Sequence, residues 1–201
     1  MNLEITAASF KEKGYKAVIF STKEEAADYL NREIDGTSVG IGGSMTIEEM
    51  GLYEILSSHN DVYWHWRPAG GMSVEELTIH AAGAKIYLAS ANGVSETGEM
   101  VNIDGKGNRL SESLYGHKKV YFIVGANKIM PDLQQAIDRA RNIAAPKNAK
   151  RLSCNTPCAL KSDKCYDCSS PERICNGMVI YFGKMFSCEM EIILINEELG
   201  Y

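Results

Sequence analysis

Hydrophobic and polar positions follow two different periods along the first 145 residues. Short apolar runs have the length and composition of buried strands, and they span 16–20, 37–42, 61–66, 85–91 and 118–126. Between them lie stretches with apolar residues at helical spacing, over 2–13, 21–34, 46–56, 73–84 and 131–145. Residues 100–110 read instead as two short strands about a glycine-rich turn. Strands separated by helices of this length form parallel β-α-β units, so the pattern predicts an α/β fold.

After residue 145 the pattern changes. Residues 146–176 are rich in cysteine, proline, serine and lysine, and two apolar runs follow them at 178–183 and 191–200. Such runs need a sheet in which to bury their side chains. We therefore expect a single domain over residues 1–201, with a cysteine-rich insertion at about 146–176 between two parts of the same body.

Composition and charge restrict the class of function. The chain has 201 residues, of which 45% are hydrophobic, and a net charge of −5, which disfavours a general nucleic-acid binder. It contains neither a secretory signal nor an apolar stretch long enough for a membrane span. The expected compartment is the cytoplasm, where thiols stay reduced. The choice between a monomer and a homo-oligomer is left open.

The stretch VGIGGSMTIEEMG (39–51) takes a strand into Gly42, Gly43 and Ser44 and then into a helix. Glycines let the backbone approach a ligand, and the first N–H groups of a helix attract anions. The alternative is a tight strand–helix turn with a capping box. Since no lysine follows the glycines and Met45 occupies the third glycine position, we find neither an ATP loop nor an NAD fingerprint.

The stretch SANGVSETGEMVNIDGKGNR (90–109) follows a strong strand and is dense in polar residues. Loops at the carboxyl ends of parallel strands share one edge of the sheet. We therefore expect Gly42–Thr46, Asn92–Thr97, Asp104–Arg109 and Lys128 to line one pocket. Within it Glu96 and Asp104 are the acid/base candidates, because neither is expected to cap a helix. A simple hairpin turn is the alternative for residues 104–107.

Five of the six cysteines fall between Cys154 and Cys175, with spacings C-x3-C, x6, C-x2-C, x6, C. Two close pairs joined by short loops suit a centre with four thiolates, either zinc or an iron–sulfur cluster. We expect the main ligands to be the symmetric set around the C-x-x-C pair, with Cys154 as a fifth thiol: Cys158, Cys165, Cys168 and Cys175. The alternatives are reduced, merely clustered thiols and disulfides formed on oxidation.

VGIGGSMTIEEMGL, SANGVSETGEMVNIDGKGNR and VGANKI occur in the order and spacing that resemble the lactate-utilisation (LUD) domain family. The segment TPC…KCYDCSSPERIC is similar to the C-terminal part of a cysteine-bearing branch. The resemblance implies a Rossmann-like three-layer sandwich, similar to ribose-5-phosphate isomerase, glucosamine-6-phosphate deaminase and CoA transferases. The motif positions that it carries over are Gly42, Gly43, Ser44, Thr46, Glu49, Asn92, Glu96, Thr97, Gly98, Asn102, Asp104, Gly105, Asn108, Arg109, Asn127 and Lys128.

The same resemblance implies a component of lactate or other 2-hydroxy-acid oxidation that binds a small anionic organic ligand, beside iron–sulfur partner proteins. Because this is a redox pathway, it favours an iron–sulfur cluster over zinc at the cysteines. Two alternatives stay open. One is an isomerase, hydrolase or transferase that acts on a phosphorylated or acyl-CoA substrate. The other is a non-enzymatic metal-cluster module that docks on a redox partner.

Overall fold

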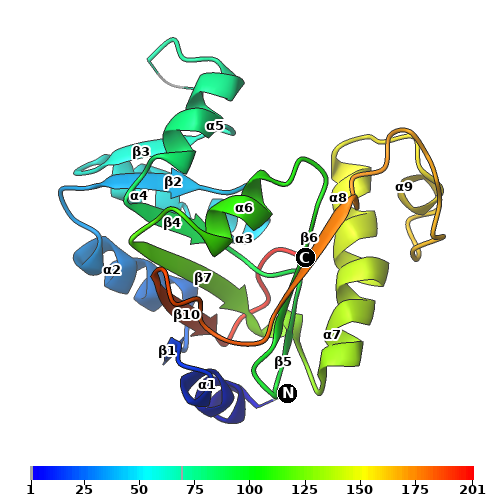
Figure 1. Cartoon of the computed structure of the whole chain (residues 1–201), viewed down its shortest axis with the longest axis horizontal. Helices are drawn as coiled ribbons and strands as arrows, with labels where there is room; N and C mark the ends of the chain where they lie inside the picture. The colour runs from blue at the N-terminus through cyan, green and yellow to red at the C-terminus, as the bar shows by residue number, and fades with distance from the viewer. Residues whose placement is uncertain (1, 69) are drawn as a thin grey trace.

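The computed structural model describes residues 2–68 and 70–201, whose strands form two sheets (Figure 1). In these residues the larger sheet has six strands, all parallel, in the order β1-β10-β7-β4-β2-β3. Its strands are β1 (Lys16–Phe20), β2 (Ser38–Ile41), β3 (Asp61–Trp64), β4 (Ile86–Ala89), β7 (Lys119–Gly125) and β10 (Glu189–Ile195).

Helices cover both faces of this sheet. On one face pack α2 (Lys23–Glu33), α3 (Met45–Glu49) and α4 (Leu52–Ser57). On the other lie α1 (Leu3–Glu12), α5 (Val74–Ala82) and α6 (Asn108–Leu114). Successive side chains along β7 pack into the two helical layers in turn: Phe122 faces the α1 side and Tyr121 faces the α2 side. The predicted Rossmann-like three-layer α/β sandwich is thereby confirmed.

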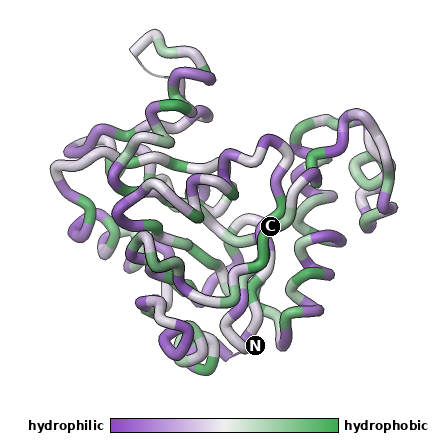
Figure 2. The backbone as a smooth tube through the Cα atoms, in the orientation of Figure 1, coloured by the Kyte–Doolittle hydropathy of each residue, from purple (hydrophilic) through white to green (hydrophobic). Residues whose placement is uncertain are grey.

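The smaller sheet has the order β8-β5-β6-β9 and packs against the α1 side of the larger one. Its strands are β5 (Gly93–Ser95), β6 (Met100–Asp104), β8 (Ile129–Met130) and β9 (Gly177–Tyr181). Its outer face is covered by a long helix made of α7 (Leu133–Arg139), a π-helical turn (Ala140–Ala144) and α8 (Ala145–Arg151). Hydrophobic and hydrophilic stretches alternate along this helix in Figure 2, as expected when only one side is packed.

Both apolar runs that follow the cysteines become strands, β9 in the smaller sheet and β10 between β1 and β7 in the larger. The cysteine segment leaves the end of α8, forms the short helix α9 (Pro157–Lys161), and returns along β9 (Figure 1). Each helix in residues 2–68 and 70–201 is too short or too polar to cross a bilayer.

Three expected elements differ from the structure. The helix expected over 46–56 is divided into α3 and α4 at Gly51, whose φ of 63° is left-handed. The expected hairpin over 100–110 is the strand β6 followed by the helix α6. The helix expected to end at residue 145 continues to Arg151, with Pro146 in the first turn of α8, directly after the π-helical turn, where a missing N–H is tolerated.

Candidate functional site

A cavity of about 900 Å³, here called the polar cavity, lies where several parallel strands of the larger sheet end. The segments that follow β2, β3, β4 and β7 contribute Gly43–Met45, His65–Trp66, Ser90–Asn92 and Lys128. Its other walls come from the first turns of α5, the turn between β6 and α6, the helix that ends at Arg151, residues 173, 174 and 176, and Tyr201. Open α/β sheets bind ligands at this end of their strands, so the polar cavity is the candidate ligand site.

The turn formed by Gly42, Gly43 and Ser44 is not simply the anion-binding loop that its sequence suggests. Ser44 caps α3 by accepting a hydrogen bond from the N–H of Ile47 at 3.3 Å. A Cβ at Gly42 would lie 2.7 Å from the Tyr87 hydroxyl and 3.0 Å from Cγ of Arg109. Gly42 therefore makes room for the Arg109 side chain, while Gly43 and Ser44 themselves line the polar cavity.

Asp104 and Arg109 form the turn that closes one side of the polar cavity. The Asp104 carboxylate accepts hydrogen bonds from the N–H groups of Gly105 at 2.8 Å and Arg109 at 3.0 Å. It thus caps the start of α6, contrary to our expectation that it caps no helix. The Arg109 guanidinium donates to the carbonyl of Ile103 at 2.5 Å. Asn108, the first residue of α6, also lines the cavity.

Glu49 and Asn127 hold the end of the chain at the site but do not themselves line the polar cavity. The N–H of Gly200 donates to Glu49 at 2.8 Å, and the Asn127 side chain bonds to Leu199 N–H at 3.2 Å and Gly200 carbonyl at 3.1 Å. These contacts place Tyr201 in the cavity wall.

The expected pocket does not include Glu96, Thr97 and Gly98. These residues form the turn between β5 and β6, at the opposite end of β5 from Asn92, which does line the cavity. Glu96 accepts a hydrogen bond from the N–H of Asn2 at 2.5 Å, and Thr97 donates to Glu99 at 2.5 Å. The antiparallel β5–β6 hairpin carries this turn away from the strand ends, so Glu96 is not an acid/base candidate for the polar cavity.

Lys128 is the most deeply buried cation of the polar cavity, at 2% exposed. Its Nζ donates to the hydroxyls of Thr46 at 2.7 Å and Ser90 at 2.8 Å. Burial, with a smaller contribution from the nearby guanidinium groups of Arg139 and Arg109, lowers the pKa of Lys128 to about 7, and the carboxylate of Glu49 opposes this shift. A lysine amine of which a large fraction is neutral near pH 7 can accept a proton or act as a nucleophile.

Several wall residues were not found by the sequence reasoning. His65 and Trp66 line the polar cavity, whereas Trp64, two positions before Trp66, is buried in the core at 1% exposed. The guanidinium of Arg151 lies 4.6 Å from the centre of a Trp66 ring. Strand alternation places Trp64 and Trp66 on the same face, and their rings are indeed stacked, so it gave no signal that only Trp66 reaches the cavity. Nothing local places Arg151 opposite Trp66 either. Burial lowers the pKa of His65, and Lys106 lowers it further.

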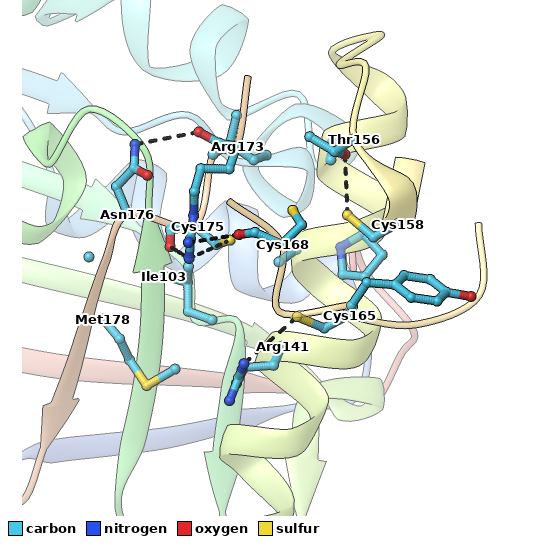
Figure 3. Close-up of a pocket in the computed structure, with 16 residues that line it drawn as sticks. Ile103, Arg141, Thr156, Cys158, Cys165, Cys168, Arg173, Cys175, Asn176 and Met178 are labelled. Atoms are coloured by element: carbon cyan, nitrogen blue, oxygen red, sulfur yellow. Dashed lines mark hydrogen bonds between the residues drawn. The ribbon is translucent and has the colours of Figure 1, made fainter. Parts of the chain in front are cut away.

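A second cavity, of about 210 Å³, lies between the cysteine segment, α8 and β9 and is here called the cysteine cavity. The four cysteines predicted as main ligands, Cys158, Cys165, Cys168 and Cys175, all line it (Figure 3). Cys154 does not line it, and Cys188 is buried in the main core. The structure therefore brings together the residues that the symmetric spacing selects.

Hydrogen bonds reach several of these sulfur atoms. Cys165 Sγ accepts from the N–H of Asp167 at 3.3 Å and from Arg141 at 3.9 Å, and Cys175 Sγ accepts from Arg173 at 3.4 Å. Thr156 Oγ1 is 3.3 Å from Cys158 Sγ. Among the described residues, no three His, Cys, Asp or Glu side chains converge on the position of a single metal ion.

The two cavities share a wall. Ile103, Ala145, Arg173, Ile174 and Asn176 line both of them. Arg173 is anchored on the cysteine side, where it donates to the carbonyls of Cys168 and Cys175 at 2.9 Å each. A group bound among the cysteines would thus lie next to a ligand bound in the polar cavity.

Comparison with known proteins places this architecture in a family. A crystal structure of a DUF162 family protein from Deinococcus radiodurans superposes with a TM-score of 0.51 at 10% sequence identity, covering 97% of this chain and 99% of that chain. At this identity the likeness concerns the fold alone. Comparison with curated proteins gives no significant match. The LUD domain family, however, matches over residues 3–195, which is nearly the whole chain. The chain therefore belongs to the LUD domain family.

Proposed function

We propose that this protein binds a small organic anion in the polar cavity as a component of lactate utilisation. Membership of the LUD domain family implies a role in lactate utilisation. The charge of the cavity wall is the observation that carries the finer proposal. Four cationic residues line it, Lys106, Arg109, Arg151 and Arg173, together with the partly protonated amine of Lys128, against the carboxylates of Glu75 and Asp104. Asp104 is already bonded to backbone N–H groups, so the free wall favours an anion.

The volume of the polar cavity bears on the size of the ligand. About 900 Å³ is at the upper end of the range for pockets that hold drug-sized ligands, so lactate alone fills a small part of it. The indole of Trp66, with Arg151 against it, offers a flat surface for a larger group. This observation favours, as a second candidate, a phosphorylated or acyl-CoA substrate of the kind used by enzymes with related folds.

Calorimetric titration with lactate, pyruvate, a sugar phosphate and coenzyme A tests the proposal and separates the two candidates. We expect binding of at least one of these anions, weakened at least tenfold in Arg151→Gln. The matched control is Arg32→Gln, which removes a charge from an exposed position on α2. Absence of binding by all four compounds, or equal losses in both variants, would refute anion binding in the polar cavity.

We further propose that the cysteine cavity holds an iron–sulfur cluster, which would supply one-electron transfer chemistry when bound. Four cysteines around a space of about 210 Å³ suit a cluster held by four thiolates. A zinc ion held by four thiolates is the alternative, and the role in lactate utilisation implied by the family, a redox pathway, favours the cluster. Hydrogen bonds from Arg141, Arg173 and Asp167 would stabilise the negative charge on the sulfurs.

Anaerobic reconstitution with iron and sulfide, followed by iron, sulfide and zinc analysis, tests this cluster. We expect bound iron and sulfide in the parent and in Cys188→Ser, and loss of most of both in Cys168→Ser. Zinc in place of iron would support a structural metal instead. Failure of the parent to retain any metal, or equal loading of the two variants, would contradict the proposed ligand set.

A further inference from the structure

The amine of Lys128 has a hydrogen-bond arrangement that suits its neutral form. Each neighbouring hydroxyl gives its own proton to a backbone carbonyl, Thr46 to Leu199 at 3.2 Å and Ser90 to Ile123 at 2.6 Å. Both hydroxyl oxygens therefore accept from Nζ of Lys128. A neutral amine has two hydrogens, and both are used here, so its lone pair is left over.

The surroundings of Lys128 contain positive charge on both sides. Arg139, at 5% exposed, donates to the carbonyls of Asn127 at 2.8 Å and Asn92 at 2.5 Å, which flank the lysine and the cavity wall. Arg109 approaches from the α6 side and lines the polar cavity with it. Burial and two neighbouring guanidinium groups disfavour a third positive charge on the lysine. They therefore favour the neutral amine, which is the nucleophilic form.

We propose that Lys128 forms a covalent imine with the carbonyl carbon of a 2-oxo acid bound in the polar cavity. This rests on the proposed function, which supplies an organic acid to that cavity. The family role in lactate utilisation makes 2-oxo acids the relevant carbonyl compounds, since oxidation of a 2-hydroxy acid yields one. Arg109 lines the same wall, and although its guanidinium is paired with Asp104 at 3.7 Å and bonded to the Ile103 carbonyl, its remaining N–H groups can face the carboxylate of the acid.

The step is a condensation and needs no oxidant or reductant. The Nζ lone pair attacks the carbonyl carbon, and a C–N bond forms as the carbonyl π bond breaks. The carbonyl oxygen then leaves with both amine hydrogens as water, and a C=N bond remains. If the imine takes up one proton, it keeps an N–H for Thr46 or Ser90, so one of the two original hydrogen bonds is preserved.

Borohydride trapping tests the imine directly, because hydride adds to the C=N carbon and fixes the acid on the lysine as a secondary amine. The full-length protein is incubated with pyruvate or 2-oxobutyrate, treated with borohydride, and analysed by intact mass and peptide mapping. We expect one adduct per chain, on Lys128, with the mass of the acid minus water plus two hydrogens. Lactate, which has no carbonyl to condense, should give none.

Lys119 is an internal control that requires no mutation. It is partly buried on β7, the strand that leads to Lys128, but it forms a 2.7 Å ion pair with Glu191, which favours its charged form and raises its pKa. We expect no adduct on it. Lys128→Arg should abolish trapping, and its circular dichroism spectrum establishes whether it folds. Because mapping of the parent protein locates the adduct, the test does not depend on this variant.

Each outcome separates the inference from the proposed function. Pyruvate that binds in calorimetry without a trapped adduct overturns the imine but leaves anion binding intact. An adduct spread over Lys119 and surface lysines also overturns it, because it indicates non-specific reaction. Absence of binding by all four anions of the calorimetric test, together with no adduct, overturns both proposals. A single adduct on Lys128 that forms faster as the pH rises from 6 to 8 supports the inference.

Discussion

Replacing Lys128 with methionine should remove a pH dependence of stability that the parent protein has. Burial lowers the pKa of Lys128 from 10.5 to about 7 in the folded chain, whereas the unfolded chain restores the ordinary value. Between these two pKa values the unfolded state binds one proton more than the folded state. Stability therefore rises with pH across this window, by up to about 1.4 kcal/mol per pH unit.

The two pKa values set the size of the effect. At pH 7 the lysine is half protonated in the folded state and fully protonated in the unfolded state. Raising the pH to 9 leaves the folded amine neutral and brings the unfolded amine closer to its own titration. Linkage then adds about 2 kcal/mol to the free energy of unfolding of the parent relative to Lys128→Met. Methionine leaves no orphaned donor, since Thr46 and Ser90 keep their bonds to carbonyls.

Urea unfolding of both proteins at pH 7 and pH 9, in reducing buffer without metal, measures this difference. Every other titratable group is common to both proteins, so its contribution cancels in the comparison. The expected result is a gain in the parent that exceeds the gain in Lys128→Met by about 2 kcal/mol. Equal pH dependence in the two proteins would mean that Lys128 is charged when folded, and the argument for a neutral amine would fail.

Four further predictions concern single residues. Gly42→Ala should destabilise the protein by about 1–3 kcal/mol in urea unfolding, because its Cβ would lie 2.7 Å from the Tyr87 hydroxyl; an unchanged midpoint would contradict this contact. Asp104→Asn should lower the free energy of unfolding by about 1–2 kcal/mol in the same assay, because one amide oxygen cannot replace two carboxylate oxygens that are bonded to separate N–H groups. Glu96→Gln should leave the anion affinity within twofold of the parent in calorimetric titration, because Glu96 does not line the polar cavity. Arg173→Gln should change the visible spectrum or lower the iron content of the reconstituted protein, because it removes the donor to Cys175 Sγ; identical spectra and iron content would argue against that contact.

The alternation of apolar runs with amphipathic stretches was enough to predict the parallel sheet and its helical layers. The same pattern gave the wrong secondary structure where a single backbone angle or a single capping hydrogen bond determines whether a helix forms. Residues 104–109 have the composition of a hairpin turn, yet Gly107, with φ of 91°, is the N-cap of α6, and the Asp104 carboxylate accepts a hydrogen bond from the N–H of Arg109 in the first turn of that helix. Neither a positive φ angle nor a capping hydrogen bond changes the spacing of hydrophobic residues, so the hydrophobic pattern could not predict this helix.

At the candidate site, too, some features could be predicted from the sequence and others only from the tertiary structure. Parallel strands deliver their following loops to one edge whatever the details of the loops, so the sequence already indicated that Ser44, Asn92 and Lys128 would meet. The symmetric cysteine spacing likewise selected the four thiols that line the cysteine cavity. These features depend only on local order along the chain.

Only the tertiary structure decided which of the polar residues face a ligand and in what ionisation state. Glu96 is only three residues from Gly93, yet it lies at the tip of a hairpin, away from the polar cavity. Arg151, at the end of α8, instead packs against Trp66 in the cavity wall. The pKa of Lys128 depends on burial and on Arg139 and Arg109, which come from two other helices. Desolvation and charge act through space between segments distant in sequence, and for that reason they could not be calculated from the chain alone.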